Sequence, residues 1–128
     1  MAGNPRKLAL VTGGAKGLGR HLCLRLAAAG YDILVNYLSS EAEADELVAQ
    51  LGKAGAAAWK HRADVSRADE VAALFDATDN ITNSGGRELG LVVNNVGIYN
   101  PVPLREIGAE QWERTIATNL NGAFHVCL

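Results

Sequence analysis

Gly13, Gly17 and Gly19 have the spacing of a loop that could bind phosphate groups through its main-chain N–H groups. They belong to a run that follows a short apolar segment at 8–11 and opens a helical pattern, Thr12-Gly13-Gly14-Ala15-Lys16-Gly17-Leu18-Gly19. The first N–H groups of a helix have no partner within the helix and lie at the positive end of its dipole. A glycine loop between a strand and a helix therefore attracts anions, and this run predicts a site for a nucleotide diphosphate.

Each of the three glycines has a separate mechanical task in this interpretation. We expect Gly13 to make the tight exit from the strand, and Gly17 to let the backbone approach a pyrophosphate with no side chain between them. Gly19 would let the helix and the strand pack closely. Glycines in a turn can also serve the turn alone, but a strand before them and a helix after them favour the nucleotide site.

Apolar runs and helical periods alternate along the rest of the chain. Buried strands are predicted over 8–11, 32–37, 56–61 and 91–93. Helices are predicted between them, with the apolar stripes Leu18, Leu22 and Leu26; Ala44, Leu47, Val48 and Leu51; and Val71, Leu74 and Phe75. Residues 79–90 are predicted to form a loop, and a last helix runs from about residue 111 to the end. Strict alternation requires right-handed crossovers, so the fold class is α/β, an open doubly wound parallel sheet of the Rossmann-like type.

The unusual residues fall where the predicted strands end. They are the glycine loop, Asn36 and Tyr37, Asp64 and Val65, and the run Asn94-Asn95-Val96-Gly97. In open parallel sheets ligands bind outside the carboxyl ends of the strands. This coincidence supports a nucleotide site at that edge of the sheet.

Composition narrows the class of protein. With 128 residues, of which 48% are hydrophobic, the chain is expected to be one dinucleotide-binding domain over 1–128. A net charge of −2 without a basic cluster argues against a nucleic-acid partner. The apolar segment at 8–11 is too short for a secretion signal or a membrane span, so no membrane partner is expected.

Cysteine and histidine carry no predicted metal or disulfide chemistry. Cys23 and Cys127 lie far apart with no Cys-x-x-Cys spacing, and both are expected to be reduced core thiols of a cytoplasmic protein. The three histidines show no paired spacing for a metal and are expected to be surface or packing residues. No metal site is predicted.

The glycine run resembles the motif Thr-Gly-x-x-x-Gly-x-Gly of the short-chain dehydrogenase/reductase family. The resemblance implies that a dinucleotide is bound by Gly13, Ala15, Lys16, Gly17, Leu18 and Gly19. The run Asn36-Tyr37-Leu38-Ser39-Ser40 is most similar to those of beta-ketoacyl-carrier-protein reductases and glucose dehydrogenases. The last helix resembles the one that packs between subunits in this family, which implies a homo-oligomer.

Two further pairs of residues resemble cofactor contacts of the family. Asp64-Val65 resembles an Asp-Val pair whose carboxylate accepts from the adenine amino group and whose next N–H donates to the ring. Asn95, Val96 and Gly97 resemble the end of Asn-Asn-Ala-Gly, where the asparagines brace neighbouring strands and the next residues pass beneath the ribose. Without the resemblance, Asp64 could be a helix-entry residue and the paired asparagines turn formers.

The end of the second strand indicates which nicotinamide cofactor is preferred. A carboxylate there would hold both ribose hydroxyls and repel a 2′-phosphate, whereas this chain has Asn36, Tyr37 and Ser39. Lys16 adds a cation within the glycine loop. Together these residues favour NADP over NAD, because a charge-assisted phosphate contact is added and a repulsion is absent. The alternative is that Lys16 is a solvated loop lysine.

Asn119 is the one catalytic position that the resemblance places. It stands within the last helical pattern, where asparagine is a poor helix former. The family's asparagine at this position disturbs the helix so that a main-chain carbonyl can hold a water of the proton relay. An exposed helical asparagine is the alternative.

The family's other catalytic groups, a serine, a tyrosine and a lysine four residues after the tyrosine, have no match here. None of Tyr31, Tyr37 and Tyr99 is followed by lysine at that distance. We therefore expect 128 residues to be the cofactor-binding half of a longer enzyme, an NADP-preferring oxidoreductase for a small carbonyl or alcohol substrate, and to be inactive alone. The competing hypothesis is a non-catalytic dinucleotide-binding or assembly module.

Overall fold

Four parallel strands form one sheet in the spatial order β3-β2-β1-β4. The computed structural model describes residues 6–128. The strands are β1 (Leu8–Val11), β2 (Asp32–Tyr37), β3 (Ala58–Arg62) and β4 (Leu89–Val93), and the helices between them are α1 (Gly17–Ala28), α2 (Glu41–Lys53) and α3 (Ala68–Gly85). The predicted α/β fold with a parallel sheet is therefore confirmed, with β3 placed two residues later at its start than expected.

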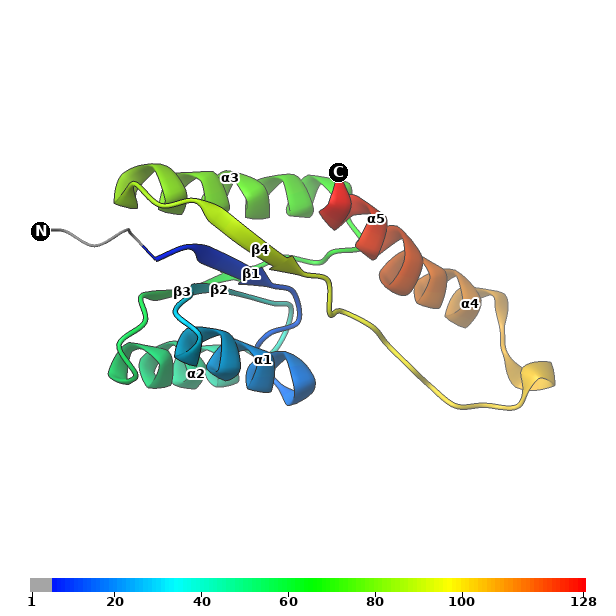
Figure 1. Cartoon of the computed structure of the whole chain (residues 1–128). Helices are drawn as coiled ribbons and strands as arrows, with labels where there is room; N and C mark the ends of the chain where they lie inside the picture. Colours follow the sequence, from blue (N-terminus) through cyan, green and yellow to red (C-terminus); the bar gives the residue numbers. More distant parts are fainter. Residues whose placement is uncertain (1–5) are drawn as a thin grey trace, which may run out of the picture.

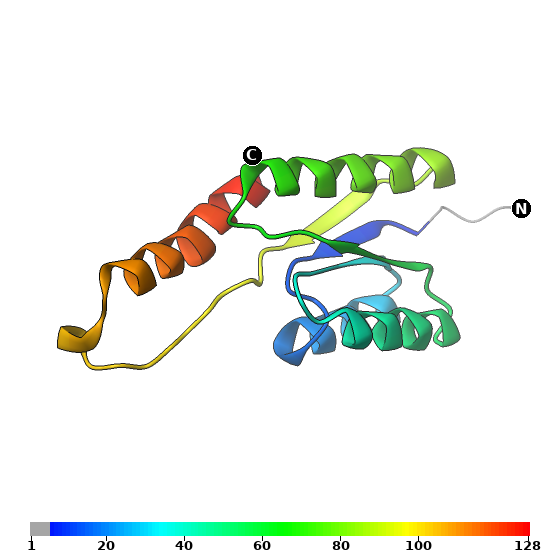
Figure 2. The same cartoon turned by 180° about the vertical axis from the view of Figure 1, so that it is seen from behind.

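Helices cover both faces of the sheet. Figure 1 and Figure 2 show α1 and α2 on one face and α3 on the other. Alternate residues of β1 and β2 feed the two layers, because successive side chains of a strand point to opposite faces. Val11 and Val35 pack with α1 and α2, whereas Leu10 and Leu34 pack with Leu74 of α3. The continuous apolar runs of these central strands are thus explained by burial on both sides.

β4 lies at one edge of the sheet and is less buried than β1 and β2. It pairs with β1 in parallel, with Leu10 opposite Val92. Leu89 and Val92 are 38% and 36% exposed. From β1 the chain adds β2 and then β3 on one side of β1, and it adds β4 on the other side. The switch in strand order therefore lies between β1 and β4.

The buried stripe of α1 differs from the predicted one. Gly19, Cys23 and Ala27 face the sheet, whereas Leu18 is 67% exposed. The prediction of a stripe through Leu18 was wrong because the smallest residues of the helix make its closest approach to the sheet. The hydrophobic period alone did not reveal this rotation of the helix about its axis.

α3 is longer than expected, and the predicted loop over 79–90 was wrong for most of its length. The helix continues through Gly85, and β4 begins at Leu89. Ile81 packs against the cluster that contains Leu74, so the second half of the helix also has an apolar anchor. Gly86 ends the helix in the left-handed conformation, with φ of 61°.

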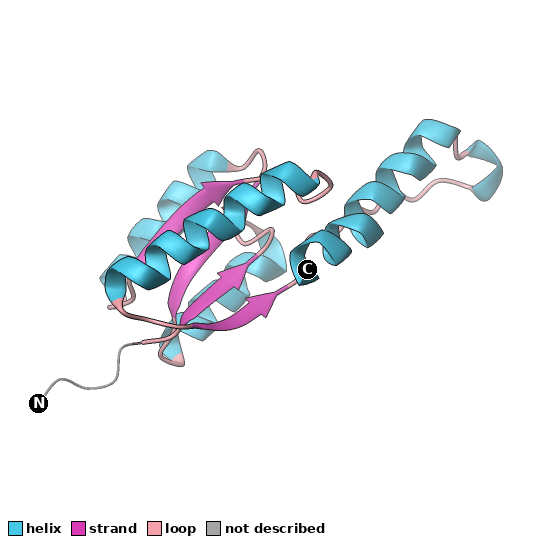
Figure 3. Ribbon diagram, turned by 90° about the horizontal axis from the view of Figure 1, so that it is seen from above, coloured by secondary structure: helices cyan, strands magenta, loops and turns pink. Residues whose placement is uncertain are grey.

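The segment after β4 extends beyond the carboxyl ends of the strands (Figure 3). It contains a 3-10 turn, η1 (Leu104–Glu106), and then the elements α4 (Ala109–Ile116), η2 (Ala117–Asn121) and α5 (Gly122–Cys127). The predicted last helix therefore exists, but η2 is a π-helical turn in its middle. A π-helical turn within an α-helix frequently marks a functional site.

A charge cluster ties the elements together at the amino ends of the strands. Asp32 is buried, and its Oδ1 accepts hydrogen bonds from Arg6 Nε at 3.0 Å and from the Ala57 N–H at 3.0 Å. Arg87 Nε lies 3.2 Å from Asp32 Oδ2 without hydrogen-bond geometry, and its guanidinium stacks 4.9 Å from the Trp59 ring centre. Asp32, the first residue of β2, thus contacts the segments that precede β1, β3 and β4.

Candidate cofactor site

The glycine loop lies at the carboxyl ends of the two central strands, between β1 and α1. Gly17 has φ of 56°, and a side chain there would meet no atom within 4 Å. The left-handed conformation favours glycine, and the open space leaves the backbone accessible to a ligand. Gly19 is the opposite case, because a Cβ atom there would collide with the carbonyl oxygen of Gly13 and lie 2.6 Å from Asn95 Nδ2.

The first N–H groups of the loop bond to Asn36 rather than pointing outward. The Gly13 N–H donates to Asn36 Oδ1 at 3.2 Å, and the Gly14 N–H donates to the Asn36 carbonyl at 2.9 Å. Asn36 Nδ2 in turn donates to the carbonyls of His61 at 3.3 Å and Ala63 at 3.2 Å. The amide of Asn36 therefore joins the ends of β1, β2 and β3. An anion bound at this loop would therefore have to use the N–H groups at the start of α1.

Asn95 and Thr12 brace the ends of β1 and β4. Asn95 Nδ2 donates to the carbonyls of Thr12 at 3.1 Å and Gly13 at 3.2 Å. Thr12 Oγ1 accepts from the N–H groups of Asn95 at 2.9 Å and Val96 at 3.3 Å. Asn94 points to the other side and donates to the Ala123 carbonyl of α5 at 3.0 Å. The two asparagines thus hold the 94–97 segment against both the glycine loop and the last helix.

Cys23 supports the glycine loop from beneath. Its thiol lies 3.8 Å from the carbonyl oxygen of Gly14, within the sulfur hydrogen-bond range. Burial raises the pKa of the Cys23 thiol to about 12, so the sulfur stays protonated and can donate. The prediction of a core thiol is confirmed for Cys23 and is wrong for Cys127, which is exposed beside Asn94.

A cavity of about 300 Å³ adjoins this edge of the sheet. Residues from the ends of β2, β3 and β4 and from the last helix line it: Asn36, Leu38, Ala63, Asp64, Val65, Ser66, Val96, Ile98, Arg114, Ala117 and Thr118. Several residues that the sequence singled out are therefore brought together here.

Asp64 and Val65 form a fixed wall of this cavity. Asp64 Oδ1 accepts from the Ser66 N–H at 3.0 Å and the Ser66 hydroxyl at 2.7 Å. Val65 is buried, and its carbonyl accepts a hydrogen bond of 2.8 Å from His125 Nδ1, which fixes the proton on that nitrogen. His125, expected only as a surface or packing residue, thus links α5 to the cavity wall.

At the end of β2, the side chains exposed to solvent are not those of Asn36 and Tyr37, which the sequence analysis named as cofactor contacts. Asn36 and Tyr37 are 1% and 7% exposed, and the Tyr37 ring packs in the core with α1 and α2. The next residues, Leu38 and Ser39, are exposed, as is Lys16 in the glycine loop. A ligand at this strand end would therefore meet the 38–40 turn rather than the Tyr37 side chain.

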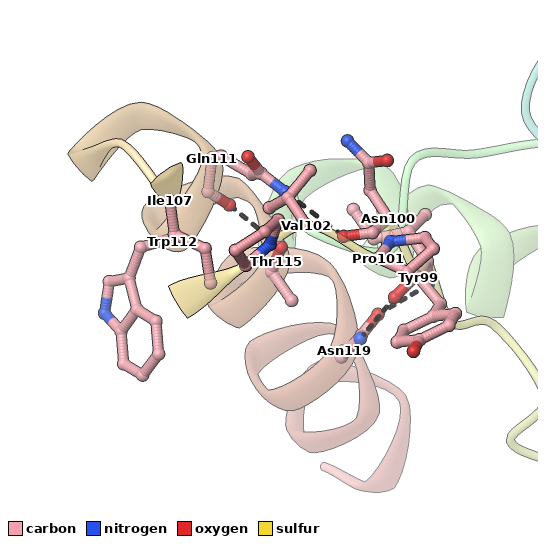
Figure 4. A pocket seen from close by; sticks show the side chains of 11 residues that line it. Tyr99, Asn100, Pro101, Val102, Ile107, Gln111, Trp112, Thr115 and Asn119 are labelled. Atoms are coloured by element: carbon pink, nitrogen blue, oxygen red, sulfur yellow. Dashed lines mark hydrogen bonds between the residues drawn. The ribbon is translucent and has the colours of Figure 1, made fainter. Parts of the chain in front are cut away.

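Asn119 lies apart from these residues, in η2. Its Oδ1 accepts from the Ile98 N–H at 2.7 Å, and its Nδ2 donates to the Ile98 carbonyl at 2.8 Å. Gly97 precedes the segment that is held in this way, and Asn119 lines a second cavity of about 510 Å³ between the 98–107 segment and α4 (Figure 4). Since Ile98 lines both cavities, Asn119 positions the segment that separates them.

Arg114 and Thr118 are lining residues that the sequence analysis missed. Both face the 300 Å³ cavity from the last helix. Their spacing of four residues was an available signal, because residues four apart share one face of a helix. Within residues 6–128, no three His, Cys, Asp or Glu side chains gather as a metal site would require.

The comparisons with known proteins agree with this geometry. A family model described as short chain dehydrogenase matches residues 7–128. The chain belongs to the short-chain dehydrogenase family. A solved member of the family, a short-chain dehydrogenase/reductase double mutant of Serratia marcescens, superposes with a TM-score of 0.83 at 26% identity, over 94% of this chain and 48% of the other.

Two curated proteins are similar in sequence to most of this chain. A 3beta-hydroxysteroid dehydrogenase 1 of Eggerthella lenta is 40% identical over 121 residues, which are 94% of this chain and 45% of that protein. A 3-oxoacyl-acyl-carrier-protein reductase of Staphylococcus aureus is 36% identical over 119 residues, 93% of this chain and 47% of that protein. The chain spans about half the length of these relatives.

In the part of the chain that the structure describes, no helix is long and apolar enough to cross a bilayer.

Proposed function

We propose that this chain is the cofactor-binding half of an NADP-preferring short-chain oxidoreductase that interconverts a carbonyl and an alcohol. The observation that carries the proposal is the switch point of the sheet. There the exposed backbone at Gly17 and the first N–H groups of α1 lie at the same edge of the sheet as the cavity walled by Asp64, Val65 and Val96, at the carboxyl ends of the strands. The open side of Gly17 and the Asp64 carboxylate in a mainly apolar cavity wall support a dinucleotide as the ligand.

The residues would divide the work of holding the cofactor. The N–H groups of Ala15, Lys16, Gly17, Leu18 and Gly19 would bind the diphosphate at the start of α1. Asp64 would accept from the adenine amino group, the Val65 N–H would donate to the ring, and Asn95, Val96 and Gly97 would support the ribose. The bound nicotinamide would supply or accept the hydride.

The NADP preference rests on charge. The 36–40 segment contains no carboxylate, its Ser39 is exposed, and Lys16 is exposed in the glycine loop. A lysine ammonium attracts a 2′-phosphate, whereas NAD offers it no such partner. The buried Asn36 and Tyr37 would act indirectly, since Asn36 fixes the loop and Tyr37 supports the turn.

Asn119 would act on the proton-transfer side of the reaction. Its side chain is committed to the Ile98 backbone, within a π-helical turn whose carbonyls are not in the regular α-helical pattern. A carbonyl released in this way can hold a water, which is the role that the short-chain family implies for this position. We further propose self-association through α4, η2 and α5, which expose Trp112, Leu120 and Phe124 respectively.

Substitution of Lys16 tests the cofactor assignment. In Lys16→Ala we expect NADPH to bind about tenfold more weakly, which corresponds to about 1.4 kcal/mol, and NADH to bind within about twofold of the unsubstituted protein. Fluorescence titration with each cofactor measures both dissociation constants. Lys53→Ala, at the end of α2, is the matched loss of one lysine. Equal losses for both cofactors would contradict the proposed role of Lys16.

A mass measurement and an activity assay separate the enzyme from a binding module. An intact protein heavier than 13.5 kDa that turns over a carbonyl substrate with NADPH supports the enzyme. An intact protein of 13.5 kDa that binds NADPH tightly and turns over no carbonyl supports the non-catalytic module instead.

A further inference from the structure

Lys60 makes a cluster of contacts on the α2 side of β3. Its Nζ forms ion pairs with Asp45 Oδ1 at 2.6 Å and with Glu41 Oε1 at 3.0 Å. The same ammonium lies 5.7 Å from the centre of the Tyr37 ring, within the range of a cation–π contact. The hydrogen bonds to Asp45 and Glu41 raise the pKa of Lys60, so the group stays charged.

These contacts bracket the 38–40 turn from both ends. Tyr37 is the last residue of β2, and Glu41 is the first residue of α2. The three residues between them include Ser39, which is exposed and stands on the flank where the proposed 2′-phosphate would lie. Lys60 comes from neither flank of the turn, but from the next strand of the sheet.

The turn leads directly into an acidic helix start. Glu41 and Glu43 lie in the first turn of α2, and Asp45 follows in the second. Negative charges a few ångströms from a phosphate repel it. This acidic segment alone would therefore oppose the NADP preference that Lys16 favours.

We infer that Lys60 is a specificity-determining positioning residue, whose ammonium offsets part of the charge of Glu41 and Asp45 and holds the 38–40 turn, so that a 2′-phosphate is accepted beside Ser39. The inference rests on the proposed NADP preference. It assigns Lys60 no contact with the cofactor, because the ammonium is already shared by two carboxylates and the Tyr37 ring.

The first test is substitution of Lys60 by a neutral residue of similar length. In Lys60→Met we expect NADPH to bind about threefold to tenfold more weakly and NADH to bind within about twofold of the unsubstituted protein, since only NADPH carries the 2′-phosphate. The difference should shrink between about 0.02 M and about 0.5 M salt, because screening weakens a charge effect. Fluorescence titration with both cofactors gives the dissociation constants.

Second variants separate charge from structure. Lys60→Arg keeps the cation and should bind NADPH within about twofold of the unsubstituted protein. Glu41→Gln in the Lys60→Met background removes one of the two carboxylates and should restore most of the lost NADPH affinity. Lys53→Ala removes a lysine at the far end of α2 and should leave the NADPH to NADH ratio unchanged.

The outcomes distinguish this inference from the proposed function. An unsubstituted protein that binds neither cofactor, or that prefers NADH, refutes the proposed NADP preference and this inference with it. An unsubstituted protein that prefers NADPH, together with a Lys60→Met variant whose preference is unchanged, refutes the role of Lys60 alone. Equal weakening of both cofactors, with no recovery from Glu41→Gln, would show that Lys60 serves only the structure of the turn.

Discussion

Gly19 shows most directly how one residue type controls the candidate site. Its Cα approaches the glycine loop so closely that a methyl group would strike the Gly13 carbonyl and the Asn95 amide. The same amide braces the ends of β1 and β4. A side chain at Gly19 would therefore disturb both the start of α1 and the 94–97 segment.

We expect Gly19→Ala to lower the free energy of unfolding by about 1–3 kcal/mol, the usual cost of overpacking a tight site. Gly52→Ala is the control, because a Cβ there meets no atom within 4 Å in helix α2. It should raise stability by up to about 1 kcal/mol through helix propensity. Urea denaturation of both variants measures the difference, and similar losses at the two glycines would argue against the tight packing at Gly19.

Single residues were predictable from sequence when their role is local. The glycine loop was found because its spacing, the strand before it and the helix after it all lie within about twenty residues. The burial of the Asn36 and Tyr37 side chains could not be predicted in this way, since it depends on how β2 pairs with β1 and β3. Lys60 was also missed, because its partner Glu41 is 19 residues away and no short motif joins them.

At the scale of elements, Asp32 holds the amino ends of the strands as the glycine loop organises the carboxyl ends. It bonds to the side chain of Arg6 before β1 and to the N–H of Ala57 before β3, and it lies beside Arg87 before β4. The side chains of Asp32 and Arg87 are only 5% and 16% exposed. The Arg87 charge is therefore compensated by Asp32, whose own charge is compensated by both Arg87 and Arg6.

Removal of this carboxylate should be costly. We expect Asp32→Ala to lower the free energy of unfolding by about 3–5 kcal/mol, because the largely buried Arg87 guanidinium loses its counter-charge. Glu88→Ala, which removes an exposed carboxylate from the same edge, should change stability by less than about 0.5 kcal/mol. Thermal or urea unfolding compares the two variants. A small loss in both would mean that the Asp32 cluster is not a stabilising element.

Element boundaries were predictable where the apolar pattern is continuous. The runs of β1 and β2 matched their strands residue for residue. α3 was predicted too short because Asn83, Ser84, Gly85 and Gly86 resemble a loop, whereas in the fold Ile81 gives this half of the helix a packing partner. The hydroxyl of Thr78 also donates back to the Leu74 carbonyl at 2.8 Å, within the helix.

At the scale of the whole molecule, α4, η2 and α5 leave large apolar side chains uncovered. Leu120 and Phe124 are 62% and 59% exposed and lie beyond the ends of the strands. We expect the protein to self-associate through this surface, and Leu120→Glu with Phe124→Glu to shift it toward monomer. Sedimentation velocity measures the distribution of species. Ala28→Glu, an exposed position on α1, is the charge control, and an identical shift in that variant would contradict the assigned surface.

The Asp32 cluster and the candidate cofactor site lie at opposite ends of the strands of one sheet. A library that varies the neighbours of Asp32 would therefore alter heat tolerance without touching nucleotide recognition. Conversely, replacing the residues of the 38–40 turn would change the proposed cofactor preference and leave the Asp32 cluster intact. Directed evolution can thus select for thermal stability and for cofactor preference separately, because the length of the sheet separates the two sets of residues.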